Sequence, residues 1–219
     1  MRGLQAAGGA ALTGETTVEG PGGDPRRSPR RRRVALLAAL AVVVYGLDLA
    51  TKTAVLRTLE GKDPLVLIPG LLQFRVIFNA GAAFSIGTGM TIVFTIIAAS
   101  VVVAILRTAR KLRSLPWAIT LGLMLGGALG NLTDRLFRAP GGFQGHVVDF
   151  VEVFPSHFPV FNVADSAIVC GGILAVYLAW RGYQLDGTRD GAHDEQEQEP
   201  EIQKEEEGSI DRAESRNDG

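Results

Sequence analysis

The sequence predicts a membrane protein with an all-α core. This core is a four-transmembrane-helix bundle with a small extracytoplasmic β-rich cradle and a surface-lying helical loop. Three observations support the prediction: four long apolar runs, connections with unequal numbers of basic residues, and outer segments with strand-like and half-apolar stretches. A spanning helix needs roughly 20 mostly apolar residues. We therefore expect spans at about 34–56, 89–107, 117–137 and 160–181.

The two ends of the chain differ in charge, although the formal net charge of all 219 residues is -1. Residues 1–33 are rich in Gly, Pro and Arg, whereas residues 184–219 are dominated by Glu, Asp and Gln. Neither end has enough apolar side chains to bury a core. We therefore predict a disordered basic extension at 1–33, a membrane domain at 34–183 and a disordered acidic tail at 184–219.

The first span follows a basic segment, an arrangement that is also typical of a secretory signal peptide. Asp48 and Lys52 lie within the run, and no Ala-x-Ala cleavage site follows it. Three more apolar runs come after it, so a multi-pass membrane protein is the better interpretation.

Each of the other three spans has a local signal of its own. The second has no charged residue between Thr91 and Leu106. The third begins after Pro116, a residue that suits the first turn of a helix. The fourth ends near Trp180 and Arg181, which are typical interfacial anchors.

Basic residues in short connections predict the orientation, because cytoplasmic loops carry an excess of Lys and Arg. The arginine cluster before the first span and the connection between the second and third spans are both basic. We therefore expect both termini to be cytoplasmic. The outer loops are then 57–88 and 138–159. We expect strands in the first, at Leu65–Ile68 and Leu71–Phe78, and a stretch along the membrane surface from Val147 to Phe161.

Two aspartates lie in membrane-length apolar runs, each three residues after an asparagine: Asn131 with Asp134, and Asn162 with Asp165. An ionisable group in a span costs at least roughly 2.5–3.5 kcal/mol and indicates a functional site. The predicted topology places both aspartates at the outer end of the bilayer core. Asp134 also continues a row of small residues that lets a neighbouring helix approach closely, formed by Gly122, Gly126 and Gly130.

Two carboxyl groups held close together share a proton, and one apparent pKa rises. Such a pair has a base to activate water and an acid to protonate a carbonyl oxygen. The pattern alone leaves alternatives open. A small membrane transporter would use the aspartates in an ion path, and a non-catalytic assembly factor would use them for helix packing.

Five motifs occur along the chain in a fixed order: Asp48 with Lys52, FNAGAAFSI (Phe78–Ile86), GNLTDR (Gly130–Arg135), VVDF (Val147–Phe150) and FNVADS (Phe161–Ser166). Over about residues 40–180, this order resembles the lipoprotein signal peptidase family, signal peptidase II. One departure is Leu49, where the family often has Gln.

The resemblance implies an aspartic endopeptidase in the bacterial inner membrane, with its active site at the extracytoplasmic face. It would remove signal peptides from prolipoproteins, cutting just before a diacylglyceryl-modified Cys. It implies a catalytic dyad of Asp134 and Asp165. Residues that bind substrate or orient the dyad are expected to be Asn131, Asn162, Asn79, Gly81, Ala82, Phe84, Arg135, Asp48 and Lys52. Asp149 is expected to give electrostatic support or to have a solvated structural role.

We expect neither a cofactor nor a metal, because His146 and His157 lack metal-ligand spacing. Cys170 lies in an apolar run and is interpreted as a packing residue. The expected partners are diacylglyceryl-modified prolipoproteins and membrane lipids, with no nucleic acid. One chain supplies both carboxylates, so a monomer is sufficient.

Overall fold

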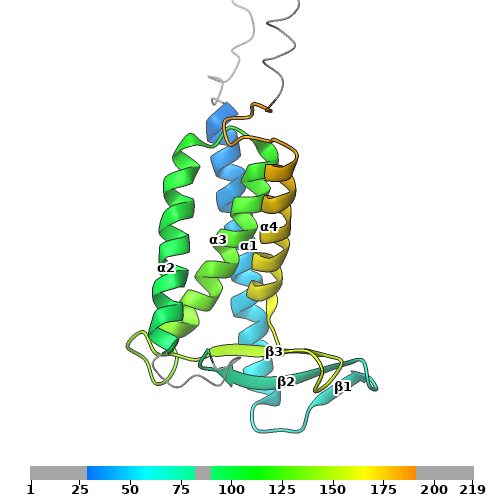
Figure 1. Ribbon diagram of the computed structural model, residues 1–219. Helices are drawn as coiled ribbons and strands as arrows, with labels where there is room; N and C mark the ends of the chain where they lie inside the picture. The colour runs from blue at the N-terminus through cyan, green and yellow to red at the C-terminus, as the bar shows by residue number, and fades with distance from the viewer. Residues whose placement is uncertain (1–28, 82–89, 191–219) are drawn as a thin grey trace, which may run out of the picture.

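The computed structural model describes residues 29–81 and 90–190, which form four helices, a short 3-10 helix and a three-stranded antiparallel sheet. The elements are α1 (Pro29–Leu59), β1 (Leu65–Ile68), β2 (Leu72–Asn79), α2 (Met90–Thr108), η2 (Ala109–Lys111), α3 (Leu115–Phe137), β3 (Val147–Val153) and α4 (Val163–Trp180). The helices stand side by side, and the sheet lies across one end of the bundle (Figure 1). The predictions for Ala82, Phe84 and most of both charged ends lie outside the described residues.

All four long helices are long and apolar enough to cross a membrane, so the prediction of a multi-pass membrane protein is confirmed. Helix α1 has 31 residues and begins at Pro29, inside the segment predicted to be disordered. At about 1.5 Å per residue, it exceeds a bilayer core of roughly 30 Å. Its last turns therefore reach the sheet, where Val55 packs with Val148 and Phe150 of β3.

Helix α3 is the centre of the bundle. In its most apolar 18-residue stretch, 56% is buried inside the protein. The corresponding shares are 22% for α1, 17% for α2 and 22% for α4. A Cβ atom on Gly126 would lie 2.7 Å from Val44 Cβ of α1, and one on Gly122 would lie 2.9 Å from Leu40 Cβ. The glycine row thus brings the two helices into close contact, as expected from its spacing.

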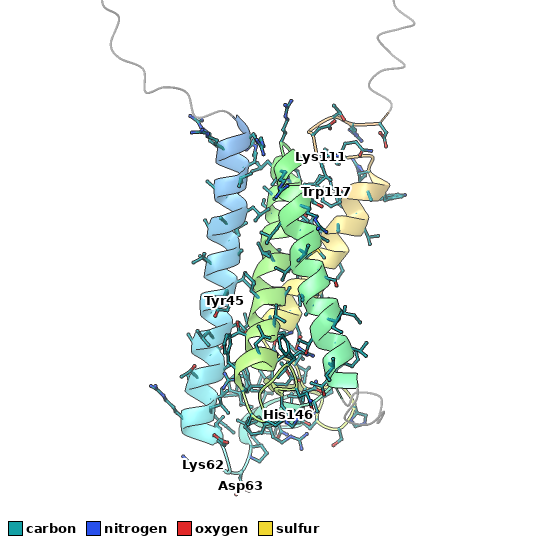
Figure 2. All side chains as sticks on the ribbon, turned by 90° about the vertical axis from the view of Figure 1, so that its left-hand side faces the viewer. Tyr45, Lys62, Asp63, Lys111, Trp117 and His146 are labelled. Atoms are coloured by element: carbon teal, nitrogen blue, oxygen red, sulfur yellow. The ribbon has the colours of Figure 1, made fainter. Side chains whose placement is uncertain are left out.

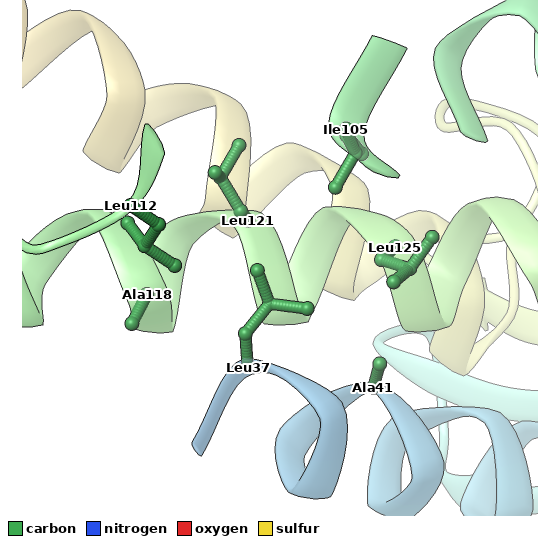
Figure 3. Packing of buried hydrophobic residues seen from close by; sticks show 7 residues of the cluster. All are labelled: Leu37, Ala41, Ile105, Leu112, Ala118, Leu121 and Leu125. Atoms are coloured by element: carbon green, nitrogen blue, oxygen red, sulfur yellow. The ribbon is translucent and has the colours of Figure 1, made fainter. Parts of the chain in front are cut away.

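An apolar cluster joins α1, α2 and α3 near the end of the bundle opposite the sheet. Figure 3 shows its buried members, which are Leu37, Ala41, Ile105, Leu112, Ala118, Leu121 and Leu125. Leu185 packs against this cluster, and its carbonyl oxygen accepts hydrogen bonds from the N–H groups of Arg113 and Ser114 at 2.8 and 3.0 Å. Figure 2 labels Lys111 and Trp117 at this end of the bundle. Here Trp117 Nε1 donates a hydrogen bond to the Tyr183 carbonyl oxygen at 2.8 Å. Leu185, in the tail predicted to be disordered, is therefore packed on the bundle, whereas residues 186–190 are exposed.

The expected strands of the first outer loop are present as β1 and β2, joined through Gly70, which has a φ of 72°. The surface-lying helical loop is a wrong prediction. Val147–Val153 is strand β3, which pairs antiparallel with β2. The stretch is rich in β-branched and aromatic residues that favour a covered strand. Its first four residues are fully buried, because the sheet and α1 cover them.

Candidate active site

Asp165 lies in the first turn of α4, where the local sequence fixes its carboxyl group. Asn162 is the N-cap residue, and its Oδ1 accepts a hydrogen bond from the backbone N–H of Asp165 at 2.8 Å. In return, the carboxylate of Asp165 accepts a hydrogen bond from the backbone N–H of Asn162 at 3.2 Å. This capping box satisfies two N–H groups that a helix leaves unpaired. The motif therefore both begins α4 and orients Asp165.

Asp149 lies on β3 and is only 2% exposed. Its two carboxyl oxygens accept hydrogen bonds from Asn162 Nδ2 at 2.7 Å and Asn79 Nδ2 at 2.8 Å. Burial raises the pKa of Asp149 to about 6, and the charge of nearby Asp165 raises it too. The two amide hydrogen bonds and the charge of Lys52 act in the opposite direction. Asp149 is therefore a buried carboxyl group that can hold a proton close to neutral pH.

Three asparagines from different elements surround these two carboxyl groups. Asn131 of α3 donates from Nδ2 to Asp165 Oδ1 at 2.7 Å. Asn79 of β2 donates to Asp149, and Asn162 hydrogen-bonds to both aspartates. The structure therefore brings together three of the asparagines that the sequence predicted to orient a dyad.

Asp134, the other aspartate of the predicted dyad, lies in a buried ion network between α1 and α3. Its Oδ2 is 2.9 Å from Lys52 Nζ and accepts a hydrogen bond from the N–H of Val148 at 3.2 Å. Its Oδ1 pairs with Arg138, one turn further along α3. Lys52 Nζ is also 2.7 Å from Asp48 Oδ2. Both oxygens of Asp134 are thus occupied by groups of the protein itself.

The residues predicted to support the site from the first span lie in the same network. Lys52 Nζ donates to Asn131 Oδ1 at 3.0 Å. Asp48 Oδ1 accepts from the N–H of Ala164 at 2.9 Å and so connects α1 to the start of α4. Leu49, the departure from the family pattern, is 39% exposed on the outer side of α1 and belongs to no buried contact of this network.

Two largely apolar grooves adjoin the carboxyl groups. The α4 groove has a volume of about 590 Å³ and is lined by Asn79, Asp149, Phe158, Pro159, Val160, Phe161, Asp165, Ser166, Val169 and Cys170. The α2–α3–α4 groove has a volume of about 250 Å³ and is lined by Phe94, Ile97, Ala98, Val101, Met124, Ala128, Asn131, Arg135 and Ile168. Asp149 and Asp165 therefore face one groove together, whereas Asp134 lines neither of these two grooves.

Gly81 holds Asn79 in place beside Asp149. Its N–H donates to Asn79 Oδ1 at 2.8 Å, which leaves the Asn79 Nδ2 group to face Asp149. Gly81 has a φ of 96°, and a Cβ atom there would lie 2.6 Å from a ring carbon of Phe94. Glycine is needed at this position both for its backbone conformation and for this close approach.

The other polar groups of the α4 groove do not form a nucleophile–base pair. Ser166 Oγ donates to the backbone carbonyl of Asn162 at 3.0 Å, a contact within its own helix. Cys170 is exposed on α4. Within residues 29–81 and 90–190, no group of three or more His, Cys, Asp or Glu side chains is arranged to hold a metal ion. The carboxyl pair is thus the group in this groove best suited to acid–base chemistry.

A bundle of four spanning helices with a carboxyl pair and apolar grooves at one end has the architecture of a membrane enzyme. Its fold matches a solved bacterial membrane enzyme with a TM-score of 0.59 and 31% identity, covering 67% of this chain and 88% of the other. A second such structure gives a TM-score of 0.58 and 32% identity, covering 66% and 92%. The model of the signal peptidase II family matches residues 40–181, and the chain belongs to this peptidase family.

The relatives agree with this assignment. The chain is 60% identical over 164 residues to the lipoprotein signal peptidase of Streptomyces coelicolor, covering 75% of this chain and 79% of the relative. It is 46% identical over 171 residues to the lipoprotein signal peptidase of Mycobacterium tuberculosis, covering 78% and 84%. The resemblance predicted from the five motifs is confirmed, and the chain is an enzyme, a peptide-bond hydrolase.

Proposed function

We propose that this chain removes signal peptides from prolipoproteins, cutting just before the diacylglyceryl-modified Cys, with Asp149 and Asp165 as its catalytic pair. The substrate class comes from the names of the Streptomyces and Mycobacterium relatives. The observation that supports the pair is their common setting. Both carboxyl groups line the α4 groove, and Asn162 hydrogen-bonds to each of them.

In this proposal Asp149 replaces Asp134, which the sequence had assigned to the dyad. Asp134 lies against two cations and accepts from a backbone N–H, so both of its oxygens are occupied by groups of the protein. The hydrogen bonds to Asp149 described above both come from side-chain amide N–H groups. Its raised pKa suits a group that gives and takes a proton during the reaction.

The proposed reaction needs one proton on the pair. The carboxylate of Asp165 takes a proton from the attacking water, while Asp149 donates its proton to the carbonyl oxygen of the scissile bond. The water oxygen bonds to the carbonyl carbon and forms a tetrahedral intermediate. Asp165 then transfers its proton to the nitrogen, Asp149 takes a proton back from a hydroxyl of the intermediate, and the C–N bond breaks, which releases the signal peptide carboxyl group and the free amine of the modified Cys. The three asparagines hold both carboxyl groups in position during these steps.

The proposal also assigns an orientation in the bacterial inner membrane. The sheet end is extracytoplasmic, because the basic connection containing Arg107, Arg110, Lys111 and Arg113 lies at the opposite end (Figure 2). Both termini are then cytoplasmic. The apolar walls of the two grooves suit a lipid-anchored, apolar precursor segment. A monomer supplies both carboxyl groups, and the reaction requires no nucleic acid. A site at one end of the bundle, rather than across its middle, disfavours a transporter.

The decisive experiment is cleavage of a purified precursor by the protein in lipid vesicles. We expect the parent protein to release the signal peptide from a diacylglyceryl-modified precursor and to leave the unmodified precursor intact. Asp165→Asn should be inactive at the same folded level, and Asp190→Asn, in the exposed turn at the far end, should be as active as the parent. Equal cleavage of both precursors would refute the lipid requirement, and an active Asp165→Asn protein would refute the pair.

The pKa of Asp149 predicts how cleavage depends on pH. A group with a pKa of about 6 is mostly protonated below that pH and mostly ionised above it. Since the proposed reaction uses the protonated form, kcat/KM should be high on the acid side and fall as the pH rises through about 6. The pH profile of kcat/KM for the lipid-modified precursor measures this directly.

Asn79→Ala provides a directional check on that profile. The hydrogen bond from Asn79 lowers the pKa of Asp149, so its removal should move the alkaline limb to higher pH. A limb that stays in place in Asn79→Ala, or moves to lower pH, would show that another group causes the decline.

A further inference from the structure

Each asparagine at the site accepts a hydrogen bond at its side-chain carbonyl oxygen. For Asn79, the donor is the N–H of Gly81, and for Asn162 it is the N–H of Asp165. Both are backbone groups, two and three residues further along the chain. For Asn131, the shorter contact comes from the side chain of Lys52 on another helix, at 3.0 Å, and Asn162 Nδ2 donates to the same oxygen at 3.3 Å. The Asn131 oxygen is therefore held by side chains, of which Lys52 makes the shorter contact.

The chemistry of the two neighbours fixes which way the Asn131 amide faces. An ammonium group only donates hydrogen bonds, and an ionised carboxylate only accepts them. Lys52 Nζ is 3.0 Å from Oδ1 of Asn131, and Asp165 Oδ1 is 2.7 Å from its Nδ2. Reversing the amide would place its NH₂ group against the ammonium and its carbonyl oxygen against the carboxylate. Both contacts would then be repulsive.

The position of Lys52 is itself fully determined. An ammonium group has three N–H donors. Lys52 Nζ forms ion pairs with Asp48 Oδ2 at 2.7 Å and Asp134 Oδ2 at 2.9 Å, and it donates a hydrogen bond to Asn131 Oδ1 at 3.0 Å. Its side chain has 0% exposure, so bulk solvent does not reach these contacts. The two carboxylates therefore compensate the buried charge and aim its third donor at Asn131.

We propose that Lys52 is a positioning residue for the peptidase reaction: it locks the Asn131 amide so that the amide donates to Asp165. This inference rests on the proposed function, because it assigns a role to Lys52 through one carboxyl group of the proposed pair. Lys52 lines neither groove described above, and its side chain is fully buried. Through Asn131, it links helix α1 to the orientation of the Asp165 carboxyl group in α4.

Without Lys52, the Asn131 amide loses the shorter of the two contacts to its oxygen, and the 3.3 Å contact from Asn162 Nδ2 remains. The NH₂ group of Asn131 is then drawn towards the uncompensated carboxylates of Asp48 and Asp134, and away from Asp165. A hydrogen bond to a charged group of this kind corresponds to about 10- to 100-fold in rate. Since the contact orients a reacting group and not the substrate, the loss should appear in kcat with KM unchanged.

A double-mutant cycle tests the inference. We expect Lys52→Met and Asn131→Ala each to lower kcat by about 10- to 100-fold at equal amounts of folded protein. The double variant should be no slower than the slower single variant, because Lys52 acts through Asn131. Losses that multiply in the double variant would overturn the inference, as would an unchanged kcat in Lys52→Met. Lys62→Met, which removes an exposed lysine at the end of α1, should cleave like the parent.

A second variant covers the case in which Lys52→Met does not fold. Asp48→Asn combined with Lys52→Met removes one negative and one positive charge, and the asparagine keeps an oxygen for the N–H of Ala164. The same cycle is then run with this charge-balanced variant, and multiplying losses again overturn the inference. The Asp165→Asn variant distinguishes a failure of the proposed function from a failure of the proposed role of Lys52. If it cleaves normally, the proposed function fails, whereas an inactive Asp165→Asn with a multiplicative cycle refutes the role of Lys52 alone.

Discussion

Changing Asp149 to Asn should lower kcat/KM for the lipid-modified precursor by at least about 10³-fold. Asparagine cannot hold or release a proton, and positioned acid–base catalysis is worth roughly 10²- to 10⁴-fold. The loss should be near the upper end of that range, because the two carboxyl groups act as a unit. Folding should be retained: among the described residues, no cation lies within ion-pair distance of Asp149. Cleavage kinetics in vesicles, normalised to folded protein, provide the measurement.

Glu152→Gln is the matched control for this change. Glu152 is a second buried carboxyl group on β3, but it accepts hydrogen bonds from Gln73 at 2.6 Å and Arg75 at 2.9 Å and lines neither groove described above. The Glu152→Gln protein should cleave the lipid-modified precursor with a kcat/KM within a few-fold of the parent value. Two outcomes would remove Asp149 from the catalytic pair: an Asp149→Asn protein as active as the parent, or equal losses in both variants.

The helices could be predicted because a membrane-spanning helix needs a certain length and an apolar composition. Both can be read from a single sequence. The expected span at 89–107 is α2 (Met90–Thr108), and the span at 117–137 is α3 (Leu115–Phe137). Strand β3 could not be predicted in this way. A short stretch such as VVDFVEV has the composition of a strand and of an interfacial segment alike. Its partner β2 lies about 70 residues earlier, so the pairing is a property of the folded chain.

The site could be predicted only in part, because the two Asn-x-x-Asp motifs make different contacts in the structure. Asn162 and Asp165 form a capping box, whereas Asn131 and Asp134 lie within α3 and face different partners. Nothing in the Asn-x-x-Asp spacing distinguishes the two cases. For Asp149, the expectation of electrostatic support stays a prediction, whereas the alternative of a solvated role neglected its burial. That alternative applied the cost of burying a charge only to membrane-length runs, yet the same cost applies to an aspartate inside an apolar strand. A solvated role for Asp149 is therefore wrong, since it is 2% exposed.

Changing Asp134 to Asn should mainly destabilise the fold. Removing one partner of a buried ion pair costs about 3–5 kcal/mol, because the remaining charges stay buried. Here the change would leave Lys52 with Asp48 as its remaining carboxylate and would leave Arg138 without its partner. The new amide also has an NH₂ group that must face a cation. We expect a clearly lower melting temperature, measured in detergent by circular dichroism, and less folded protein in membranes.

The activity of each folded Asp134→Asn molecule separates this role from a catalytic one. Lys52 still reaches Asn131 and Asp48, so the amide lock on Asp165 is weakened but not removed. Cleavage per folded molecule should therefore exceed that of Asp149→Asn by at least about 10-fold, because the proton-holding group is intact. The opposite pattern, a stable Asp134→Asn protein as inactive as Asp165→Asn, would return Asp134 to the dyad. In that case the buried network would be part of the reacting machinery, and Asp149 would be its support.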